Sequence, residues 1–454
     1  MDPRFLPHNT HRDGLRAFYE RDPQLRTLTG LPLVHRTGLI EALPRRTPGI
    51  YTLGGGRQVG KTTLLKQWMA QLLTDGVAPG AIAFFTGEVI DDHHALLRLL
   101  TEELGAMNGP TRFVIIDEVS YIREWDRAVK YVADSGMLEE TVLLITGSDL
   151  AFLRDVRVTL PGRRGTATVT DFLLHPLSFQ ESVGLGRRLP DLESVIDPGF
   201  IPGSATIDIL FDEFERYLIH GGYLTAMNDM ARFDDIRPAT LATYHEWVRG
   251  DMLKRGRREA FLREILGAIV NRYGSQVTWN ALARELSIDH PRTVADYVEI
   301  LASMEAVFVQ PALLEDKLCA APKKPKKIVF TDPFIFHAIR HWLSPTPSPL
   351  SDQIRPAVSD PIWSGRLAEA CVSTHLRRFF PTYYIKAEGE VDAAVVREGR
   401  FWPIEVKWTG QLRPKDLKQI RKYANGVIWG RVRTRHELQG VPVYPLPLAL
   451  LRLG

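Results

Sequence analysis

The sequence predicts an α/β protein built on a parallel sheet, followed by regions with other strand and helix patterns. Strand and helix patterns alternate over residues 49–176, a glycine-rich loop joins the first strand to a helix, and the strands are continuous apolar runs. Continuous apolar strands indicate a parallel sheet that is covered on both faces. The expected strands are residues 50–53, 81–85, 113–116, 142–146 and 166–172.

The loop after the first strand is a phosphate-binding motif. It reads Gly55-Gly56-Arg57-Gln58-Val59-Gly60-Lys61-Thr62-Thr63, which fits Gly, four free positions and then Gly-Lys-Thr. Glycines permit positive φ and turn backbone N–H groups toward phosphates. We expect Lys61 to reach the β- and γ-phosphates and the Thr62 hydroxyl to bind Mg²⁺, while the dipole of the following helix favours the anion. The predicted cofactors are therefore ATP and Mg²⁺.

Two later strands end in polar residues that indicate hydrolysis. The apolar run 113–116 ends in Asp117 and Glu118, at the edge where open α/β sheets bind ligands. Asp117 is expected to hold the Mg²⁺ shell and Glu118 to orient and polarise the attacking water. After the strand 142–146, either Thr146 or Ser148 is the candidate sensor of the γ-phosphate, and a simple turn is the alternative.

The composition indicates an intracellular protein of several domains. A chain of 454 residues suggests about three domains, and 44% hydrophobic residues allow each to bury a core. The net charge of +3 means that any nucleic-acid surface must be local. Cys319 and Cys371 form neither a metal-binding spacing nor a disulfide framework. Because no apolar run approaches the ~20 residues that span a bilayer, we expect a cytoplasmic protein without membrane contact.

The region after the sheet is expected to form a helical lid and then a winged helix. Residues 184–204 are rich in Gly and Pro and predict an irregular insertion, and helical patterns return over 211–255 with a break at Gly221-Gly222. Helices at 261–272, 279–286 and 291–301, then strands at 307–311 and 328–331, follow the order of a winged helix. Arg292 on the third helix is a candidate nucleic-acid contact. Asp296 and Glu299 on the same helix leave a structural or protein-binding role equally open.

A run of lysines precedes the last of these strands. Lys323, Lys324, Lys326 and Lys327 form the sharpest basic cluster of the chain and are predicted to neutralise DNA phosphates. A solvated loop of lysines is the alternative. The following stretch 345–362 is rich in proline and is expected to be a linker or loop.

The C-terminal residues contain a second candidate site. Glu369 lies in an expected helix, Asp392 in the second of three strands, and Glu405 and Lys407 in the third. Since residues alternate faces along a strand, Glu405 and Lys407 point the same way, and Asp392 joins them if the two strands pair. Asp392 and Glu405 can hold Mg²⁺ or Mn²⁺, Glu369 can assist, and Lys407 can position a nucleophilic water. This is the layout of the PD-(D/E)XK nuclease fold. A solvated, non-catalytic face is the alternative.

Over nearly its whole length the chain resembles prokaryotic P-loop ATPases of the AAA+ type that carry a C-terminal domain of unknown function similar to PD-(D/E)XK nucleases. The matching pieces are the phosphate-binding loop, 116–119 with Trp125, 144–148, 160–163, 175–179, 221–223, 324–332 and the C-terminal acidic set. Family members usually have Pro where Gly56 stands. The resemblance implies an AAA+ core, and it makes Arg163 a candidate finger on the γ-phosphate, acting in trans within a homo-oligomer. A surface arginine is the alternative.

Four domains are therefore expected: an AAA+-like ATPase core with an N-terminal extension (1–180), a helical lid (181–255), a winged helix (256–335) and a PD-(D/E)XK-like domain (336–454). Two functions stay open. An ATP-dependent, metal-requiring nuclease that acts on DNA is favoured by the intact Asp392, Glu405 and Lys407. An ATP-operated regulatory or signalling switch, which binds DNA or a protein without cleaving, is favoured by the modest net charge and the acidic third helix.

Overall fold

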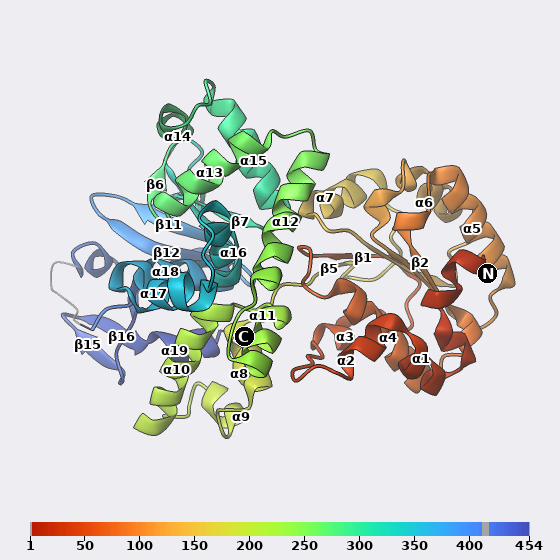
Figure 1. Cartoon of the computed structure of the whole chain (residues 1–454), viewed down its shortest axis with the longest axis horizontal. Coiled ribbons are helices and arrows are strands. Elements are labelled where there is room, and N and C mark those ends of the chain that lie inside the picture. The colour runs from red at the N-terminus through yellow and green to blue at the C-terminus, as the bar shows by residue number, and fades with distance from the viewer. Residues whose placement is uncertain (1, 411–416, 454) are drawn as a thin grey trace. The chain divides into compact units, whose positions relative to one another are not determined.

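The computed structural model describes residues 2–410 and 417–453, and the chain divides into two compact units (Figure 1). The first unit ends at His175 and the second begins at Pro176. Within the described residues, none of the helices combines the length and the apolar character that crossing a bilayer requires.

A five-stranded sheet, parallel throughout, forms the centre of the first unit, as the alternation of strands and helices predicts. The strand order is β2-β3-β4-β1-β5. The strands are β1 (Gly49–Gly54), β2 (Ile82–Thr86), β3 (Arg112–Asp117), β4 (Thr141–Thr146) and β5 (Asp171–Leu173), the last shorter than expected. Because β1 lies between β4 and β5, the loop after β1 opens in the interior of the sheet's carboxyl edge.

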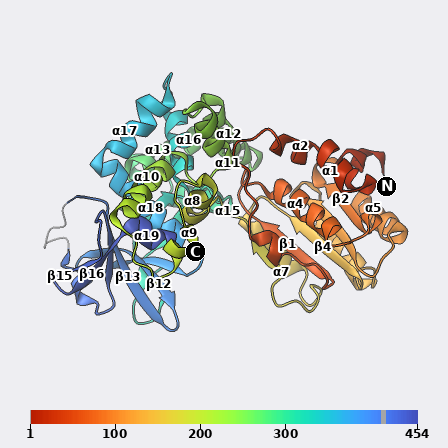
Figure 2. The same cartoon turned by 90° about the horizontal axis from the view of Figure 1, so that it is seen from below.

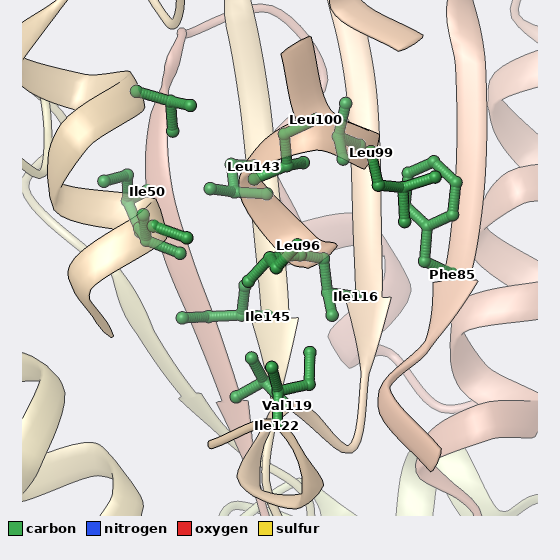
Figure 3. Packing of buried hydrophobic residues seen from close by; sticks show 14 of the residues in the cluster. Ile50, Phe85, Leu96, Leu99, Leu100, Ile116, Val119, Ile122, Leu143 and Ile145 are labelled. Atoms are coloured by element: carbon green, nitrogen blue, oxygen red, sulfur yellow. The ribbon is translucent and has the colours of Figure 1, made fainter. Parts of the chain in front are cut away.

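Helices cover both faces of this sheet, which explains why its strands are apolar on both sides. Figure 2 shows α4 and α7 on opposite sides of the sheet. One face packs on α4 (Lys61–Thr74), and the other on α5 (His93–Ala106), α6 (Trp125–Asp134) and α7 (Leu150–Thr159). Figure 3 shows part of the hydrophobic cluster on the face covered by α5, α6 and α7. In this cluster the strand residues Ile50, Ile116, Leu143 and Ile145 pack with Leu96, Leu99 and Leu100 of α5.

The N-terminal extension belongs to the core of the first unit. Phe5 and Phe18 are fully buried in the two clusters that flank the sheet. The side-chain amide of Asn9 donates to the carbonyl of Phe84 and accepts from its N–H, each at 2.8 Å, so it caps the edge strand β2. The elements are η1 (Pro3–His8), η2 (Thr10–Asp13), α1 (Leu15–Arg21), α2 (Pro23–Leu28) and α3 (Leu39–Ala42), and the short turns of the core are η3 (Pro79–Ala81), η4 (Gly87–Val89) and η5 (Val119–Tyr121).

The second unit begins with helices. They are α8 (Phe179–Gly186), α9 (Leu192–Ile196), α10 (Ser204–His220), α11 (Leu224–Phe233) and α12 (Pro238–Lys254). The stretch 184–204 is therefore less irregular than expected, because α9 buries Val195. The break at Gly221-Gly222 is real and has a steric cause. A Cβ on Gly222 would lie 2.0 Å from the carbonyl oxygen of Leu177, so only glycine fits there.

Three helices and a small antiparallel sheet follow. The helices are α13 (Glu259–Asn271), α14 (Trp279–Glu285) and α15 (Pro291–Ser303). The sheet has the order β6-β10-β7, with β6 (Gln276–Val277), β7 (Val307–Pro311) and β10 (Lys326–Phe330), and between β7 and β10 lies the hairpin of β8 (Leu313–Leu314) and β9 (Cys319–Ala320). The element order is the one expected for residues 256–335.

The proline-rich stretch 345–362 is not the linker or loop that its composition predicts. After α16 (Pro333–Leu343) it forms the π-helical turn η6 (Leu350–Ile354) and α17 (Arg355–Ser359). Leu350, Ile354 and Ala357 are buried at helical spacing. Proline is tolerated here because Pro356 stands in the first turn of its helix.

A six-stranded mixed sheet ends the chain, with strand order β11-β12-β13-β14-β16-β15. Its strands are β11 (Thr382–Lys386), β12 (Glu390–Arg397), β13 (Arg400–Lys407), β14 (Val427–Gly430), β15 (His436–Leu438) and β16 (Val441–Pro445). The helical turn η8 (Ile420–Lys422) precedes β14, and helix α19 (Leu446–Leu451) follows β16. The preceding helix α18 (Pro361–Leu376) packs against β12 and β13 (Figure 1). The sheet face that carries Glu405 and Lys407 is largely covered, since Glu405 is buried and the Lys407 side chain is 22% exposed.

Candidate functional site

The phosphate-binding loop has the backbone that its glycines predict. Gly55 and Gly60 have φ of 149° and 97°, and Gln58 also lies in the left-handed region. A Cβ on Gly55 would lie 2.4 Å from the carbonyl oxygen of Leu174. Helix α4 begins at Lys61, and no side chain caps its first N–H groups. The loop and the helix start therefore present backbone donors and a positive dipole end, which is the arrangement that binds phosphate.

Lys61 is buried inside this loop. Its ammonium donates to the carbonyl oxygens of Gly55 and Gly56, at 3.0 and 2.9 Å, and lies 3.7 Å from Glu118 Oε1. Burial lowers the pKa of Lys61, and the charges of Glu118 and Asp117 offset this in part. The loop thus places one cation beside the two carboxylates that end β3.

Asp117 is held between two hydroxyl groups. The Thr62 hydroxyl donates to Asp117 Oδ2 at 2.5 Å, and the Thr146 hydroxyl donates to Asp117 Oδ1 at 2.6 Å. The carboxylate and the Thr62 hydroxyl are both hard oxygen donors, which are the ligands that Mg²⁺ prefers. The two residues predicted to hold Mg²⁺ are therefore in direct contact, and this donor set fits the ion.

Glu118 combines burial with an unusual backbone. Its φ is 55°, in the left-handed region that non-glycine residues rarely adopt, and such strain clusters at functional sites. The N–H of Glu118 donates to the Thr146 hydroxyl at 2.8 Å, and Gly87 approaches so closely that a Cβ there would lie 2.4 Å from the Glu118 carbonyl oxygen. Within the described part of the chain, Glu118 Oε2 is buried and has no hydrogen-bond partner.

The electrostatics of Glu118 favour proton transfer. Burial raises the pKa of Glu118, while the charge of Lys61 and a hydrogen bond with Ser148 act in the opposite direction. A carboxylate with a raised pKa is a better general base near neutral pH. The structure also separates the two sensor candidates. The Thr146 hydroxyl forms hydrogen bonds with the Asp117 side chain and with the backbone N–H of Glu118, whereas Ser148 forms a hydrogen bond with the Glu118 side chain.

Arg163 lies near the amino ends of the strands, at the opposite end of the sheet from the phosphate-binding loop. Its guanidinium donates to Asp134, the last residue of α6, at 2.5 Å, and the adjacent Arg164 donates to the carbonyl of Ile50 at the start of β1. The six residues of β1 span about 20 Å, which separates this end of the sheet from Lys61. Arg163 therefore does not reach the phosphate loop of its own chain. Its action in trans stays a prediction.

The four C-terminal residues predicted to form a site converge. The antiparallel register pairs Ala393 with Ile404, and one further step places Asp392 opposite Glu405. The Lys407 ammonium lies 2.5 Å from Glu405 Oε1 and 3.6 Å from Asp392 Oδ2. Helix α18 brings Glu369 to the same cluster through Lys327, a fifth residue that contacts both Glu369 and Asp392.

Lys327 is not part of an exposed basic cluster, so its prediction as a DNA contact is wrong. Its side chain is 1% exposed and pairs with Glu369 at 2.6 Å, with Asp392 at 3.7 Å and with Glu390. The physical reason is that Lys327 lies within strand β10, against α18 and β12, and three carboxylates compensate its burial.

The other residues predicted to contact DNA do not join Lys327 among these carboxylates. Lys323 is exposed, the half-buried Lys324 donates to the carbonyl of Lys386 at 2.9 Å, and the ammonium of Lys326 lies 5.4 Å from the centre of the Trp279 ring. On α15, Arg292 is exposed and its N–H donates to the His290 ring. These residues do not form one continuous basic face.

Carboxylates outnumber ammonium groups in the C-terminal cluster, and burial changes their protonation. Burial raises the pKa of Glu369 to about 7 and that of Glu405 to about 8. Burial opposes the charge on Lys327 and Lys407, but the surrounding carboxylates more than offset it, so the pKa of each lysine is raised. Within the described residues, Glu405 Oε2 is buried without a hydrogen-bond partner.

Glu390 is the functional candidate that sequence reasoning missed. Its ligand atom and those of Glu369 and Asp392 all lie within 4.8 Å of one another, close enough to share a cation. Oxygen donors of this kind suit Mg²⁺ or Mn²⁺. The available signal was its position two residues before Asp392, because residues i and i+2 share one face of a strand.

Comparison with known proteins identifies the first unit. Residues 47–183 match the family described as AAA domain, residues 211–346 match a domain of unknown function (DUF8612), and residues 364–448 match another (DUF4143). No curated protein matches the chain. The first unit contains an AAA-type P-loop ATPase domain, as its loop and strands predict.

Three solved structures are similar to parts of this chain. The Walker-type ATPase PABY2304 of Pyrococcus abyssi is 16% identical, with a TM-score of 0.41, over 64% of this chain and 91% of that chain. The ORC2 protein of Aeropyrum pernix, in ADPNP and ADP complexes, is 14% identical, with a TM-score of 0.37, over 69% and 95%. RuvB of Thermotoga maritima, as the T158V variant, is 17% identical, with a TM-score of 0.28, over 66% and 88%.

Proposed function

We propose that the chain is a Mg²⁺-dependent ATPase whose nucleotide cycle controls a nuclease-like C-terminal domain that acts on DNA. The contact of Thr62 with Asp117, beside Lys61 and the unpartnered carboxylate oxygen of Glu118, supports the ATPase part. The convergence of Asp392, Glu405 and Lys407 supports the nuclease part, and it is the observation that carries the proposal.

In ATP hydrolysis each residue has a separate task. The N–H groups of the loop bind the phosphates, and Lys61 moves its hydrogen bonds from the carbonyls of Gly55 and Gly56 to the phosphate oxygens. Thr62 and Asp117 would hold Mg²⁺, and the ion would supply positive charge beside the β- and γ-phosphates. Glu118 accepts a proton from the water that attacks the γ-phosphorus, the bond from that phosphorus to the bridging oxygen breaks, and ADP leaves. Ser148 keeps the Glu118 side chain in place.

In the C-terminal domain, Asp392 and the neighbouring glutamates would hold Mg²⁺ or Mn²⁺, and that ion would stabilise charge on a phosphodiester. Lys407 donates to Glu405 and lies beside Asp392, so its ammonium is placed to orient a water at this cluster. The water oxygen forms a bond to phosphorus while the bond from phosphorus to one sugar oxygen breaks, and the proton that the water loses ends on that sugar oxygen as a hydroxyl group. We further propose that residues 256–335 form a winged helix, a proposal supported by their element order.

A cleavage assay on duplex, single-stranded and branched DNA tests the nuclease part, with Mg²⁺ or Mn²⁺ and with and without ATP. Lys407→Ala should abolish metal-dependent cleavage and leave ATP hydrolysis intact. Lys422→Ala is the matched control, because Lys422 lies in the same domain but is exposed and pairs with Glu388. Cleavage that persists in the Lys407 variant would refute the assignment.

A second function, an ATP-operated switch that does not cut DNA, is favoured by a different observation. Strand β7 and the residues just before β10, which would belong to the wing, are docked on the C-terminal sheet. Gln310 donates to the carbonyls of Tyr383 and Asp392, and Tyr384 donates to the carbonyl of Pro325. A docked wing serves a contact within the protein.

Salt-dependent DNA binding tests whether the chain binds DNA, which the nuclease requires and the switch does not. A DNA-binding protein should show a slope of log K against log[salt], and each lost phosphate contact should flatten it by about 0.9. The combined Lys323, Lys324 and Lys326→Ala variant should therefore have a flatter slope than wild type. A protein that binds none of the DNA forms would refute the nuclease and support a switch that binds a protein, whereas DNA binding without cleavage would support a switch that binds DNA.

A further inference from the structure

Lys327 occupies a position that a metal ion would need. Its ammonium contacts Glu369, Glu390 and Asp392, and these are the same three residues whose ligand atoms lie within 4.8 Å of one another. Divalent cations and ammonium groups compete for carboxylate oxygens, and Mg²⁺ requires them at about 2.0–2.1 Å. The ammonium and a divalent ion cannot both lie among these three carboxylates without close contact between like charges.

The lysine is brought to the cluster by a strand from outside the C-terminal sheet. Strand β10 pairs with β7 through residues 326–330 and with β6 through residues 326 and 327. The small sheet and the residues just before β10 make four further contacts with β11 and β12. They join Gln276 to Glu390, Gln310 to the carbonyl of Asp392, Lys324 to the carbonyl of Lys386, and the carbonyl of Pro325 to Tyr384. The insertion of Lys327 is thus part of a larger docking contact, and it would be lost if that contact opened.

Asp392 links the lysine to the rest of the site. Its Oδ1 faces Lys327, while its Oδ2 accepts from the N–H of Val406 at 2.9 Å and faces Lys407. One oxygen of Asp392 is therefore committed to the residues proposed for cleavage and the other to the residue from β10. A change at Lys327 acts directly on a proposed metal ligand.

We propose that Lys327 is a built-in cation that blocks the C-terminal metal site, so that this site takes up Mg²⁺ or Mn²⁺ when β10 withdraws its lysine. This inference rests on the proposed function of the cluster as a metal site. It adds an autoinhibitory contact, in which the strand that carries Lys327 controls access of the metal to Glu369, Glu390 and Asp392.

The test measures Mn²⁺ binding to the full chain by electron paramagnetic resonance, without nucleotide. Asp117→Asn in every sample silences the site in the first unit. Lys327→Met should bind one Mn²⁺ at least 10-fold more tightly than the parent chain. Lys326→Met, one residue away and over Trp279 instead of among carboxylates, should bind like the parent. Adding Asp392→Asn to the Lys327 variant should remove the gain.

A second variant protects the test against misfolding, because Lys327→Met leaves three carboxylates without their cation. In Lys327→Met with Glu390→Gln one positive and one negative charge are removed together, so the charge of the cluster is that of the wild type. Its thermal midpoint should rise when Mn²⁺ is added, by more than that of the parent. Equal Mn²⁺ affinity in the parent and both Lys327 variants would overturn the inference.

The outcomes also separate this inference from the proposed function. Tighter Mn²⁺ binding without DNA cleavage would support the blocking role of Lys327 and refute the nuclease. Lys407-dependent cleavage by a chain whose Mn²⁺ affinity does not respond to Lys327→Met would support the nuclease and refute the blocking role. Absence of Mn²⁺ binding in every variant would refute both.

Discussion

Replacement of Glu118 by glutamine should stop ATP hydrolysis while preserving nucleotide binding. Glutamine has the same shape, so the left-handed backbone and the contact with Ser148 can persist, but it cannot accept the proton of the attacking water. General-base catalysis is worth about 10²–10⁴ in rate, or about 3–5 kcal/mol. We expect kcat to fall by at least 100-fold.

The same change should leave ATP affinity equal to that of the wild type or up to about tenfold tighter. The Glu118 carboxylate lies 3.7 Å from the Lys61 ammonium, and their gross attraction is about 4.5 kcal/mol at an effective dielectric constant near 20. Desolvation cancels most of this attraction. What is left competes with the attraction of Lys61 for phosphate, so its removal frees the ammonium for ATP.

Single-turnover hydrolysis and titration with a fluorescent ATP analogue measure the two effects separately. Glu124→Gln is the matched control, because Glu124 is also acidic, also has φ of 55° and lies in the loop region after β3, yet its side chain is about half exposed. A wild-type rate in Glu118→Gln, or an equal loss of binding and rate, would refute the assignment.

The pH dependence gives an independent check. A general base works only when it is deprotonated, and burial raises the pKa of Glu118 above its ordinary value. The rate of hydrolysis should therefore decrease as pH falls through that raised pKa. This acid limb should be absent from the residual activity of Glu118→Gln.

Two further predictions concern the loop lysine and the glycine pair. Lys61→Ala should lose ATP binding, and if Arg163 acts in trans, a mixture of Lys61→Ala with Arg163→Ala should hydrolyse ATP faster than either variant alone; no recovery on mixing would contradict action in trans. Gly222→Ala should lower the free energy of unfolding in urea by about 3 kcal/mol, because its Cβ would lie 2.0 Å from the carbonyl oxygen of Leu177. Its control, Gly250→Ala, should raise that free energy by up to about 1 kcal/mol, since a Cβ there meets no atom within 4 Å in helix α12, and a similar response of both variants would refute the steric explanation.

The parts of the fold that sequence predicts well are those fixed by local pattern. The phosphate-binding loop depends on glycines within nine consecutive residues, and the strand that ends in Asp117 and Glu118 is one uninterrupted apolar run. The prediction of a loop before α18 was wrong because it rested on the proline content alone. The positions of the prolines in first helical turns, with Leu350 and Ile354 at helical spacing, allow helices instead.

Lys327 could not be predicted because its environment is assembled from distant parts of the chain. Its sequence neighbours are lysines and a proline, which is typical of a solvated loop. Its carboxylate partners lie in α18 and β12, and the segment that contains Lys327 docks on them through the antiparallel pairing of β10 with β7. The burial of Lys327 depends on strand pairing between distant residues, which the local sequence around Lys327 does not indicate.

Because β10 places Lys327 among carboxylates of the C-terminal region, it limits where genetic recombination can divide such a chain. A gene segment that began at residue 336 would encode Glu369, Glu390 and Asp392 without the lysine that neutralises them. Burying these carboxylates without a cation is costly, so the transplanted segment would need a substitute positive charge from its new host. Residues 326–330 and the last strands should therefore be inherited together, and a breakpoint between them should be tolerated only where a metal ion or another basic side chain takes the place of Lys327.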